Sequence, residues 1–291
     1  MARIAIIGGG SMGEAILAGL LRSGRQVKDL VVVEKAPARA RQLSTTYAVQ
    51  VTSDIADAAG HAGYVVVAVK PTDVAQVVTE IAAASVKGDD GIAEQVFVSV
   101  AAGVSTAFYE SSLPAGAAVV RAMPNAPALV GAGVTALARG RFATPEQLRE
   151  VAALFEAVGS VEEVPEAQLD AVTAVSGSGP AYFFLMVEAL VDAGVAAGLT
   201  RSVATDLAVQ TMAGSAAMLL ERMDRDRRGA DGALPGGIDT TAAQLRATVT
   251  SPGGTTAAGL RELEKGGLRA AVAAAVESAK TRSEQLGITP E

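Results

Sequence analysis

The sequence predicts an α/β domain with a mostly parallel, doubly wound sheet, followed by an all-α domain. Short apolar runs alternate with helical patterns through the first half of the 291 residues, which is typical of a parallel sheet covered by helices. A glycine-rich turn separates the first apolar run from the first helical pattern. From Glu166 onward the pattern is helical almost throughout. We therefore expect one domain over residues 1–163 and a second over residues 164–291.

The glycine-rich turn follows the first expected strand, Arg3–Ile7. It reads Gly-Gly-Gly-Ser-Met-Gly, and a helical pattern begins at Glu14. In this context Gly8 permits the tight turn, Gly10 lets the backbone approach a pyrophosphate and Gly13 lets helix and strand pack closely. The turn therefore predicts a dinucleotide site of the Rossmann kind, which would also use Ser11 and Met12.

The residues after the second expected strand, Val31–Val33, leave the choice of dinucleotide open. Glu34 could accept hydrogen bonds from the adenosine ribose, which favours NADH and would repel a 2′-phosphate. Lys35 and Arg39 could hold that phosphate and favour NADPH, or they could be solvated residues of the next helix. We expect NADPH as the cofactor, with NADH possible.

Further strands are expected at Tyr64–Val69, Val96–Val100 and Val119–Ala122. The carboxyl ends of parallel strands form the rim at which a dinucleotide lies. The cofactor-binding residues expected at this rim are Val69, Lys70, Pro71, Ala101 and Asn125, with Met123 beside the nicotinamide or simply packed there.

Local signals mark the helices that follow. Thr144, Pro145 and Gln147 predict a capped helix start, and the helix should run to about Gly159. In the second domain, Ser176 and Ser178 are expected to cap a helix that begins at Pro180. Breaks in the helical pattern are expected at Ser176–Pro180, Gly198–Thr200, Arg227–Gly237 and Ser251–Gly254.

The run Val249–Leu260 places a proline, two glycines and several hydroxyls before an apolar helical pattern. Pro252 and the glycine pair should end one helix, and Thr255 or Thr256 can cap the next. A helix start presents free backbone N–H groups, which suit a small anion such as a carboxylate.

Composition limits the classes of function. Hydrophobic residues make up 50% of the chain and aromatics only 3%, so the core must use Ala, Val and Leu, and association between subunits would compensate for their small buried area. The net charge of −7 argues against nucleic-acid binding.

Glu188 and Asp192 interrupt the best candidate for a membrane span. There is no cysteine and we assign no metal site. The first apolar run is a strand of the fold and not a signal peptide, so we expect a cytoplasmic protein.

The glycine turn and the run Val249–Leu260 together resemble those of the pyrroline-5-carboxylate reductase family. Val69–Pro71, Arg121–Asn125 and Ser176–Tyr182 extend the resemblance, which covers the whole chain. The chain departs from the family at Thr241-Ala242, where a His-Pro pair is frequent, and at Ala247, where an acidic residue is common.

The resemblance implies reduction of 1-pyrroline-5-carboxylate to L-proline by hydride from NAD(P)H, the last step of proline biosynthesis. It implies a helical domain that interlocks with a second subunit, larger assemblies of such dimers and a substrate pocket at the dimer interface. Thr256 would be catalytic, with its hydroxyl on the ring nitrogen, although it could also be a plain helix cap. The substrate-binding set would be Ser251, Gly253, Gly254, Thr255 and Thr256.

The chemistry fits the residues available. A cyclic imine can be reduced as its iminium, so it needs orientation and one hydrogen-bond partner more than a strong acid. The one histidine, His61, should have a surface or packing role. One alternative is a β-hydroxyacid dehydrogenase-like oxidoreductase, which would need a lysine such as Lys265 or Lys280. Another is a non-enzymatic dinucleotide-binding redox sensor, which would have no reason to keep the anion-binding loop.

Overall fold

The computed structural model describes residues 2–85, 95–227 and 240–287. Contacts between Cα atoms divide the chain into two compact units. The first comprises residues 1–180 and 275–291, and the second comprises residues 181–274. Because the last part of the chain belongs to the first unit, this division does not measure the predicted domain boundary between residues 163 and 164, which stays a prediction.

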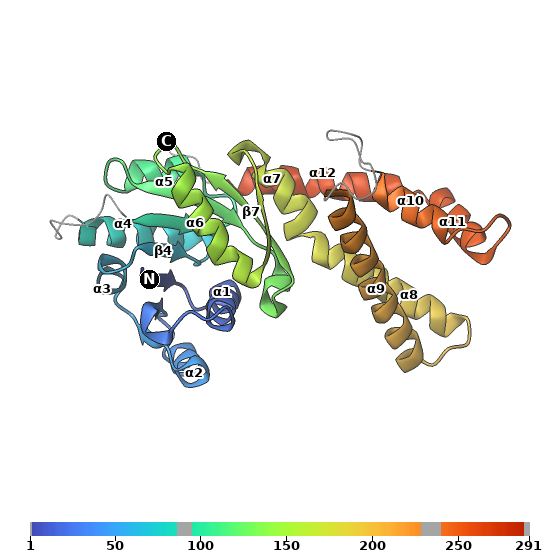
Figure 1. The fold of residues 1–291 in the computed structure, drawn as a ribbon, viewed down its shortest axis with the longest axis horizontal. Coiled ribbons are helices and arrows are strands. Elements are labelled where there is room, and N and C mark those ends of the chain that lie inside the picture. The colour runs from blue at the N-terminus through green and yellow to red at the C-terminus, as the bar shows by residue number, and fades with distance from the viewer. Residues whose placement is uncertain (1, 86–94, 228–239, 288–291) are drawn as a thin grey trace. The chain divides into compact units, whose positions relative to one another are not determined.

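The first unit is built on one sheet (Figure 1), which among the described residues has eight strands in the order β3-β2-β1-β4-β5-β6-β7-β8. Neighbouring strands are parallel except β6 and β7. The bounds are β1 Ile4–Ile7, β2 Leu30–Val33, β3 Gln50–Thr52, β4 Tyr64–Val67, β5 Val96–Ser99, β6 Ala118–Met123, β7 Gly133–Arg139 and β8 Gly159–Glu163. The predicted doubly wound, mostly parallel sheet is confirmed.

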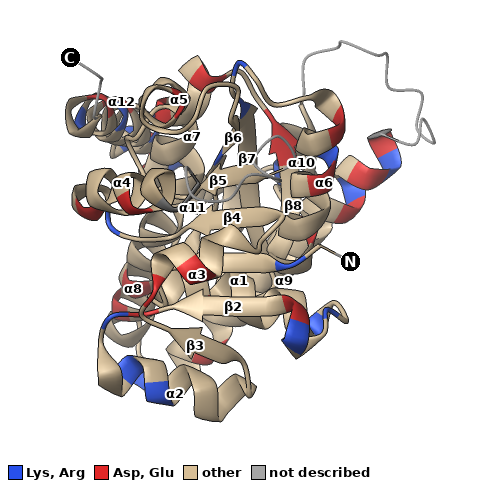
Figure 2. Ribbon diagram, turned by 90° about the vertical axis from the view of Figure 1, so that its left-hand side faces the viewer, with Lys and Arg blue, Asp and Glu red and all other residues tan. Residues whose placement is uncertain are grey.

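Helices cover both faces of this sheet. Alternate residues of β1 enter different cores: Ile4 and Ile6 join the cluster that contains Leu17 of α1, whereas Ala5 and Ile7 join the cluster that contains Val77 of α4. Strands β4 and β5 carry no charged residue and are tan in Figure 2, as expected for strands buried on both faces. The helices of this part are α1 Ser11–Arg22, α2 Pro37–Tyr47, α3 Ile55–Gly60, α4 Val74–Ser85, α5 Thr106–Ser112, α6 Pro145–Phe155 and α7 Leu169–Val172.

The helix start at Thr144 is confirmed in detail. The Thr144 hydroxyl accepts from the Gln147 N–H and the Gln147 side chain accepts from the Thr144 N–H, which completes a capping box. Helix α6 ends at Phe155, earlier than the predicted Gly159. A short 3₁₀ turn, Glu156–Val158, follows it, and Gly159 adopts φ +149° at the start of β8.

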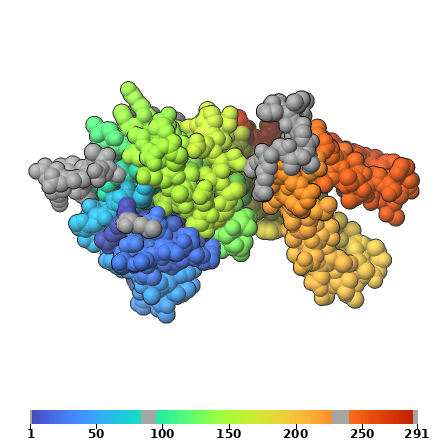
Figure 3. Space-filling model, in the orientation of Figure 1, coloured from blue at the N-terminus to red at the C-terminus, as the bar shows by residue number. Residues whose placement is uncertain are grey.

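The second unit is helical. Its elements are α8 Gly179–Ala196, which begins in the first unit, α9 Arg201–Arg227, α10 Thr241–Thr248, α11 Thr255–Lys265 and the first part of α12 Leu268–Leu286. Near their shared turn, gold in Figures 1 and 3, α8 and α9 pack through Val191, Ala204 and Ala208. All but the first residue of the predicted loop Arg227–Gly237 lies outside the described residues.

The predicted helix break at Ser176–Pro180 is confirmed in part: Ser178 is a bend, and α8 begins at Gly179, one residue before the predicted Pro180. Residues Thr173–Gly177 form a π-helical segment between α7 and α8, in which the Ser178 N–H donates to the Thr173 carbonyl at 2.8 Å. The predicted capping role of Ser176 is wrong, since its hydroxyl donates back to the Val172 carbonyl at 3.0 Å. A wider turn keeps the chain helical as far as Gly177.

Within the described chain, two helical stretches meet the length and hydropathy of a membrane span, by composition alone: Glu166–Ala196 and Arg201–Asp226. The expectation that Glu188 and Asp192 rule out such a stretch was therefore too strict. Large apolar side chains stand exposed on both helices of this single chain, among them Phe183 at 62%, Phe184 at 63% and Leu220 at 64%.

Candidate cofactor and substrate sites

A cavity of about 850 Å³ lies in the first unit, where the strand order reverses between β1 and β4, the usual place for a ligand in such a sheet. It is lined by residues that follow β1, β2, β4, β5 and β6. Of the twelve predicted cofactor residues, all of them described, eleven line it: Gly8, Gly10, Ser11, Met12, Glu34, Lys35, Val69, Lys70, Pro71, Ala101 and Asn125.

The glycine turn fits its predicted roles. Gly8 has φ +110°, and a Cβ there would lie 2.8 Å from the Ala68 carbonyl oxygen. Gly13, the twelfth residue, is buried in the turn, since its Cβ would lie 2.0 Å from the Gly8 carbonyl oxygen. A Cβ at Gly10 would meet no atom of the described residues within 4 Å. The free N–H groups at the start of α1 can therefore receive an anion at the cavity wall.

Glu34 is held in place at one end of the cavity. Its Oε2 accepts from the Gly9 N–H at 3.2 Å and its Oε1 accepts from the Ala36 N–H at 2.8 Å. Two backbone donors thus fix the carboxylate directly after β2. Lys35 is more exposed, with 57% of its side chain accessible, and its Nζ lies 3.6 Å from Oε1 of Glu80.

Arg39 is not a solvated residue, since it has partners within the chain. Its Nε donates to the Gly9 carbonyl at 2.7 Å and its guanidinium pairs with Glu14 at 2.6 Å. The Tyr47 hydroxyl donates to the same carboxylate at 3.1 Å, and burial and this hydrogen bond raise the pKa of Tyr47. Arg39 therefore ties α2 to the glycine turn.

At the other end of the cavity, Met123 and Asn125 face a second segment of chain. Thr173, Gly177 and Ser178 line the cavity there, and a Cβ at Gly177 would lie 3.0 Å from Cε of Met123. Sequence reasoning missed this wall because the serine-glycine run was interpreted as a helix break. The Ser-Gly-Ser-Gly-Pro pattern itself was the available signal.

The predicted substrate loop forms a compact turn before α11 in the second unit. Gly253 has φ +69°, and the Gly254 N–H donates to the Ser251 carbonyl at 3.0 Å. Gly254 occupies the N-cap position, so capping by Thr255 or Thr256 is wrong: these residues are the first two of the helix, and within the described chain neither hydroxyl caps it. Both threonines are exposed. Their hydroxyls and the first N–H groups of α11 are thereby presented together.

One of the positions that depart from the resembled family, Thr241, has a contact of its own. Thr241 is buried and its hydroxyl donates to Asp226 at 3.2 Å, which joins the start of α10 to α9. Arg246, beside Ala247, lies 3.8 Å from Glu264 of α11. Contacts of this kind support the loop between α10 and α11.

The two lysines that the dehydrogenase alternative would need lie on the surface of this chain. Lys265 lies in the last turn of α11, 77% exposed, with its Nζ 3.4 Å from Glu262. Lys280 pairs with Glu284 at 2.5 Å and is 45% exposed. His61 is exposed at the end of α3, which confirms its surface role. Neither lysine has the desolvated surroundings that tune such a group for proton transfer.

The fold and the cavity define a two-domain, dinucleotide-dependent oxidoreductase. Comparisons with known proteins then specify the family. Residues 166–286 match a model described as pyrroline-5-carboxylate reductase dimerisation, and residues 3–103 match one described as NADP oxidoreductase, coenzyme F420-dependent. The chain belongs to the pyrroline-5-carboxylate reductase family, as the resemblance predicted.

Relatives share the whole length of the chain. It is 70% identical over 292 residues to pyrroline-5-carboxylate reductase of Mycobacterium tuberculosis, covering 100% of this chain and 99% of the relative. A solved reductase from Coxiella burnetii is 34% identical with a TM-score of 0.86, covering 99% of each chain. A pyrroline carboxylate reductase from Plasmodium falciparum, solved with NADP bound, is 27% identical with a TM-score of 0.80, covering 99% and 98%.

Family membership confirms the predicted activity. The protein is an NAD(P)H-dependent oxidoreductase that reduces 1-pyrroline-5-carboxylate to L-proline, and NADPH is its cofactor. The dimerisation match also supports homo-oligomerisation, and it includes α8 and α9 with their exposed apolar side chains. The dehydrogenase and redox-sensor alternatives are not needed.

Proposed function

We propose that the cavity of the first unit holds NADPH along its length. The adenosine end lies at Glu34 and Lys35, the pyrophosphate lies on the first turn of α1, and the nicotinamide lies between Met123 and the segment Thr173–Ser178. The observation that carries this proposal is that residues from five strand ends line one cavity, as a dinucleotide across a strand-order reversal requires. Gly13 shapes the turn beneath the pyrophosphate.

We propose that Lys35 supplies the positive charge for the 2′-phosphate. Arg39 is engaged with Gly9 and Glu14, whereas Lys35 has, among the described residues, only an exposed ion pair with Glu80 to give up. Exposed pairs of this kind contribute little stability. The Glu34 carboxylate repels the 2′-phosphate of NADPH and can accept hydrogen bonds from the ribose of NADH. NADH should therefore also be accepted as a cofactor.

The substrate is held by the loop before α11. The exposed hydroxyl of Ser251, the backbone of Gly253 and Gly254, and the N–H groups of Thr255 and Thr256 receive its carboxylate, because the first N–H groups of a helix lie at its positive end. Thr256 is the catalytic residue, whose hydroxyl hydrogen-bonds the ring nitrogen. Hydride adds to the C=N carbon of the iminium, and the π electron pair moves to nitrogen to give the amine of proline.

The remaining expectations are proposals about the whole molecule. We propose a homodimer formed by the helical domain, residues 164–291, that assembles further and has its substrate pocket at the dimer interface. The exposed apolar residues of α8 and α9 support burial against a second copy in preference to a lipid bilayer. A cytoplasmic location and the lack of nucleic-acid and membrane partners stay predictions.

The decisive experiment is spectrophotometric oxidation of NADPH, and separately of NADH, with 1-pyrroline-5-carboxylate. We expect turnover with both cofactors and a higher kcat/KM for NADPH. Protein that binds the nucleotide but oxidises neither cofactor with this substrate would contradict the proposal. Oxidation of β-hydroxy acids in the reverse assay would then favour the dehydrogenase reading.

A further inference from the structure

The Asn125 amide bridges two elements beside the cavity. Asn125 is 9% exposed and follows β6. Its Oδ1 accepts from the Val134 N–H at 3.0 Å, and its Nδ2 donates to the Ser176 carbonyl at 3.1 Å. Asparagine at the start of a helix usually caps it. In the described residues, however, Asn125 precedes the 3₁₀ helix Ala126–Val130 without capping it. Its amide is instead committed to β7 and the π-helical segment.

The Ser176 carbonyl accepts this bond at the point where Pro180 interrupts the hydrogen-bond pattern of an α-helix. In an α-helix its acceptor would be filled by the N–H of the residue four positions later, which here is Pro180. Proline has no N–H. A carbonyl left without a donor away from water costs free energy. Asn125, 51 residues earlier in the chain, donates to this carbonyl from outside the helix.

The segment that Asn125 holds forms the wall of the cavity. Thr173, Gly177 and Ser178 line it, while Leu169 and Ala174 are fully buried behind them. Segments with π-helical geometry are frequent at functional sites. The position of this segment therefore sets the shape of the cavity at the end where Met123 lies.

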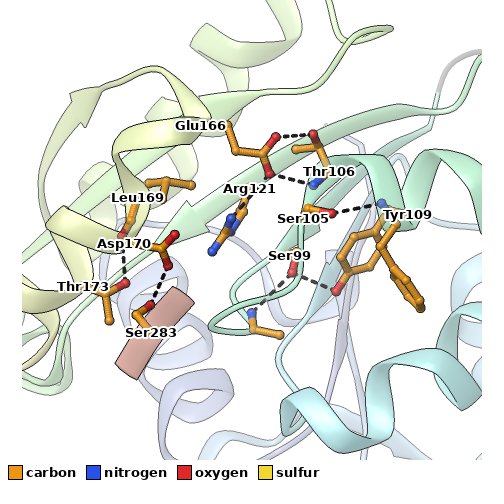
Figure 4. Close-up of polar contacts among 12 residues, drawn as sticks. Ser99, Ser105, Thr106, Tyr109, Arg121, Glu166, Leu169, Asp170, Thr173 and Ser283 are labelled. Atoms are coloured by element: carbon orange, nitrogen blue, oxygen red, sulfur yellow. Dashed lines mark hydrogen bonds and ion pairs between the residues drawn. The ribbon is translucent and has the colours of Figure 1, made fainter. Parts of the chain in front are cut away.

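The chain that leads into α7, and through α7 into this segment, is held by a separate group of contacts, shown in Figure 4. Glu166 accepts from the Thr106 N–H at 2.7 Å and from its hydroxyl at 2.5 Å, and the Arg121 guanidinium lies 3.4 Å away. These contacts fix the chain before α7. The bond from Asn125 to Ser176 fixes the segment on the side that lines the cavity.

We propose that Asn125 is a positioning residue for hydride transfer, which holds the Thr173–Ser178 wall against the nicotinamide without using its own amide to bind the cofactor. The inference rests on the proposed cofactor site. Because the adenosine and pyrophosphate contacts come from other elements, loss of the Asn125 donor should leave nucleotide affinity nearly intact. It should lower turnover, since hydride transfer depends on placement at the reacting end.

The test replaces only the donor. Asn125→Asp keeps the acceptor for Val134 and the size of the side chain, but sets an oxygen against the Ser176 carbonyl. We expect kcat to fall by roughly 10²-fold, as misplacement at a reacting centre can cause, while the Kd for NADPH changes less than about threefold because its ground-state binding is retained. Hydrogen exchange over residues 169–180 should become faster. Asn125→Leu, which is similar in size and removes both the donor and the acceptor without adding charge, gives a second variant should the first not fold.

Gln95 offers a matched control. It is also 9% exposed, and its Nε2 donates to the carbonyls of Ala59 and Ala62 at 2.8 Å, beside α3. Gln95→Glu should lower thermal stability but leave the kcat of the folded protein and the exchange of residues 169–180 unchanged.

Two results would overturn the proposal. One is a wild-type kcat with unchanged exchange of residues 169–180 in both Asn125 variants. The other is a rise in the NADPH Kd as large as the fall in kcat, which would make Asn125 a direct cofactor ligand. If the unmodified protein does not reduce 1-pyrroline-5-carboxylate, the proposed function fails by itself, whereas exchange still reports whether Asn125 holds the wall.

Discussion

Ser283 donates a 2.6 Å hydrogen bond to Oδ1 of Asp170, although the two residues lie 113 positions apart (Figure 4). Ser283 is 6% exposed in the last part of α12, and Asp170 lies in α7. Both belong to the first compact unit. The bond joins the end of the chain to the short helix that leads into the cavity wall.

We predict that Ser283→Ala lowers the free energy of unfolding by about 1.5–3 kcal/mol, the range for a hydrogen bond to a charged group. Urea unfolding at neutral pH measures it. Ser278→Ala, an exposed position of the same helix, should change stability by less than about 0.5 kcal/mol. Equal effects of the two substitutions would mean that the bond to Asp170 contributes nothing measurable.

Thr256→Ala should lower turnover by roughly 10²-fold, the contribution of one positioned hydrogen-bonding or proton-transfer group. The substitution leaves the N-cap of α11 intact, because Gly254 occupies that position. Thr256→Ser retains the hydroxyl and should keep most of the activity. Unchanged turnover of the alanine variant at saturating substrate would remove Thr256 from the mechanism.

Glu34→Ala with Lys35 retained should shift cofactor preference toward NADPH. Removing the carboxylate removes its repulsion of the 2′-phosphate, and we expect the ratio of kcat/KM for NADPH over NADH to rise about tenfold, which corresponds to about 1.4 kcal/mol. Glu34 also holds the Gly9 and Ala36 N–H groups, so Glu34→Gln separates the charge from this structural role. An unaltered ratio in both variants would show that Glu34 does not reach the ribose.

Stability should fall at alkaline pH because the folded protein retains protons on the buried Tyr109 and the half-buried Tyr64. Burial raises the pKa of Tyr109 to about 12, although its hydrogen bond with Ser99 lowers it, and burial together with the Glu150 hydrogen bond raises that of Tyr64 to about 12. Both are near 10 when unfolded. Between pH 10 and 12 the unfolded state therefore binds fewer protons, and stability decreases with pH.

Tyr109→Phe should make this alkaline loss shallower than in the unmodified protein. Urea unfolding at several pH values from 9 to 11 gives, for each of the two proteins, the slope of the free energy of unfolding against pH. Identical slopes would show that Tyr109 ionises equally in the folded and unfolded states.

The predicted strands and the glycine turn agree with the structure because short-range physics decides them. Gly8 needs positive φ, Gly13 has no room for a Cβ, and Thr144 and Gln147 are close enough in sequence to cap one another. Strands β3, β7 and β8 were missed. β3 has only three residues, none of them fully buried, and β7 pairs antiparallel with β6, against the parallel pattern around it.

The sequence by itself determined the family, the glycine-rich turn after β1, the turn before α11 and most of the described strands, because each depends on residues that are neighbours along the chain. Only the tertiary structure decided three contacts between residues that are distant in the sequence. Arg39 binds Gly9 and Glu14, the end of α12 joins α7, and Asn125 donates to the Ser176 carbonyl beside the bend at Ser178. In each case the deciding partner lies at least 25 residues away, beyond the reach of any local pattern.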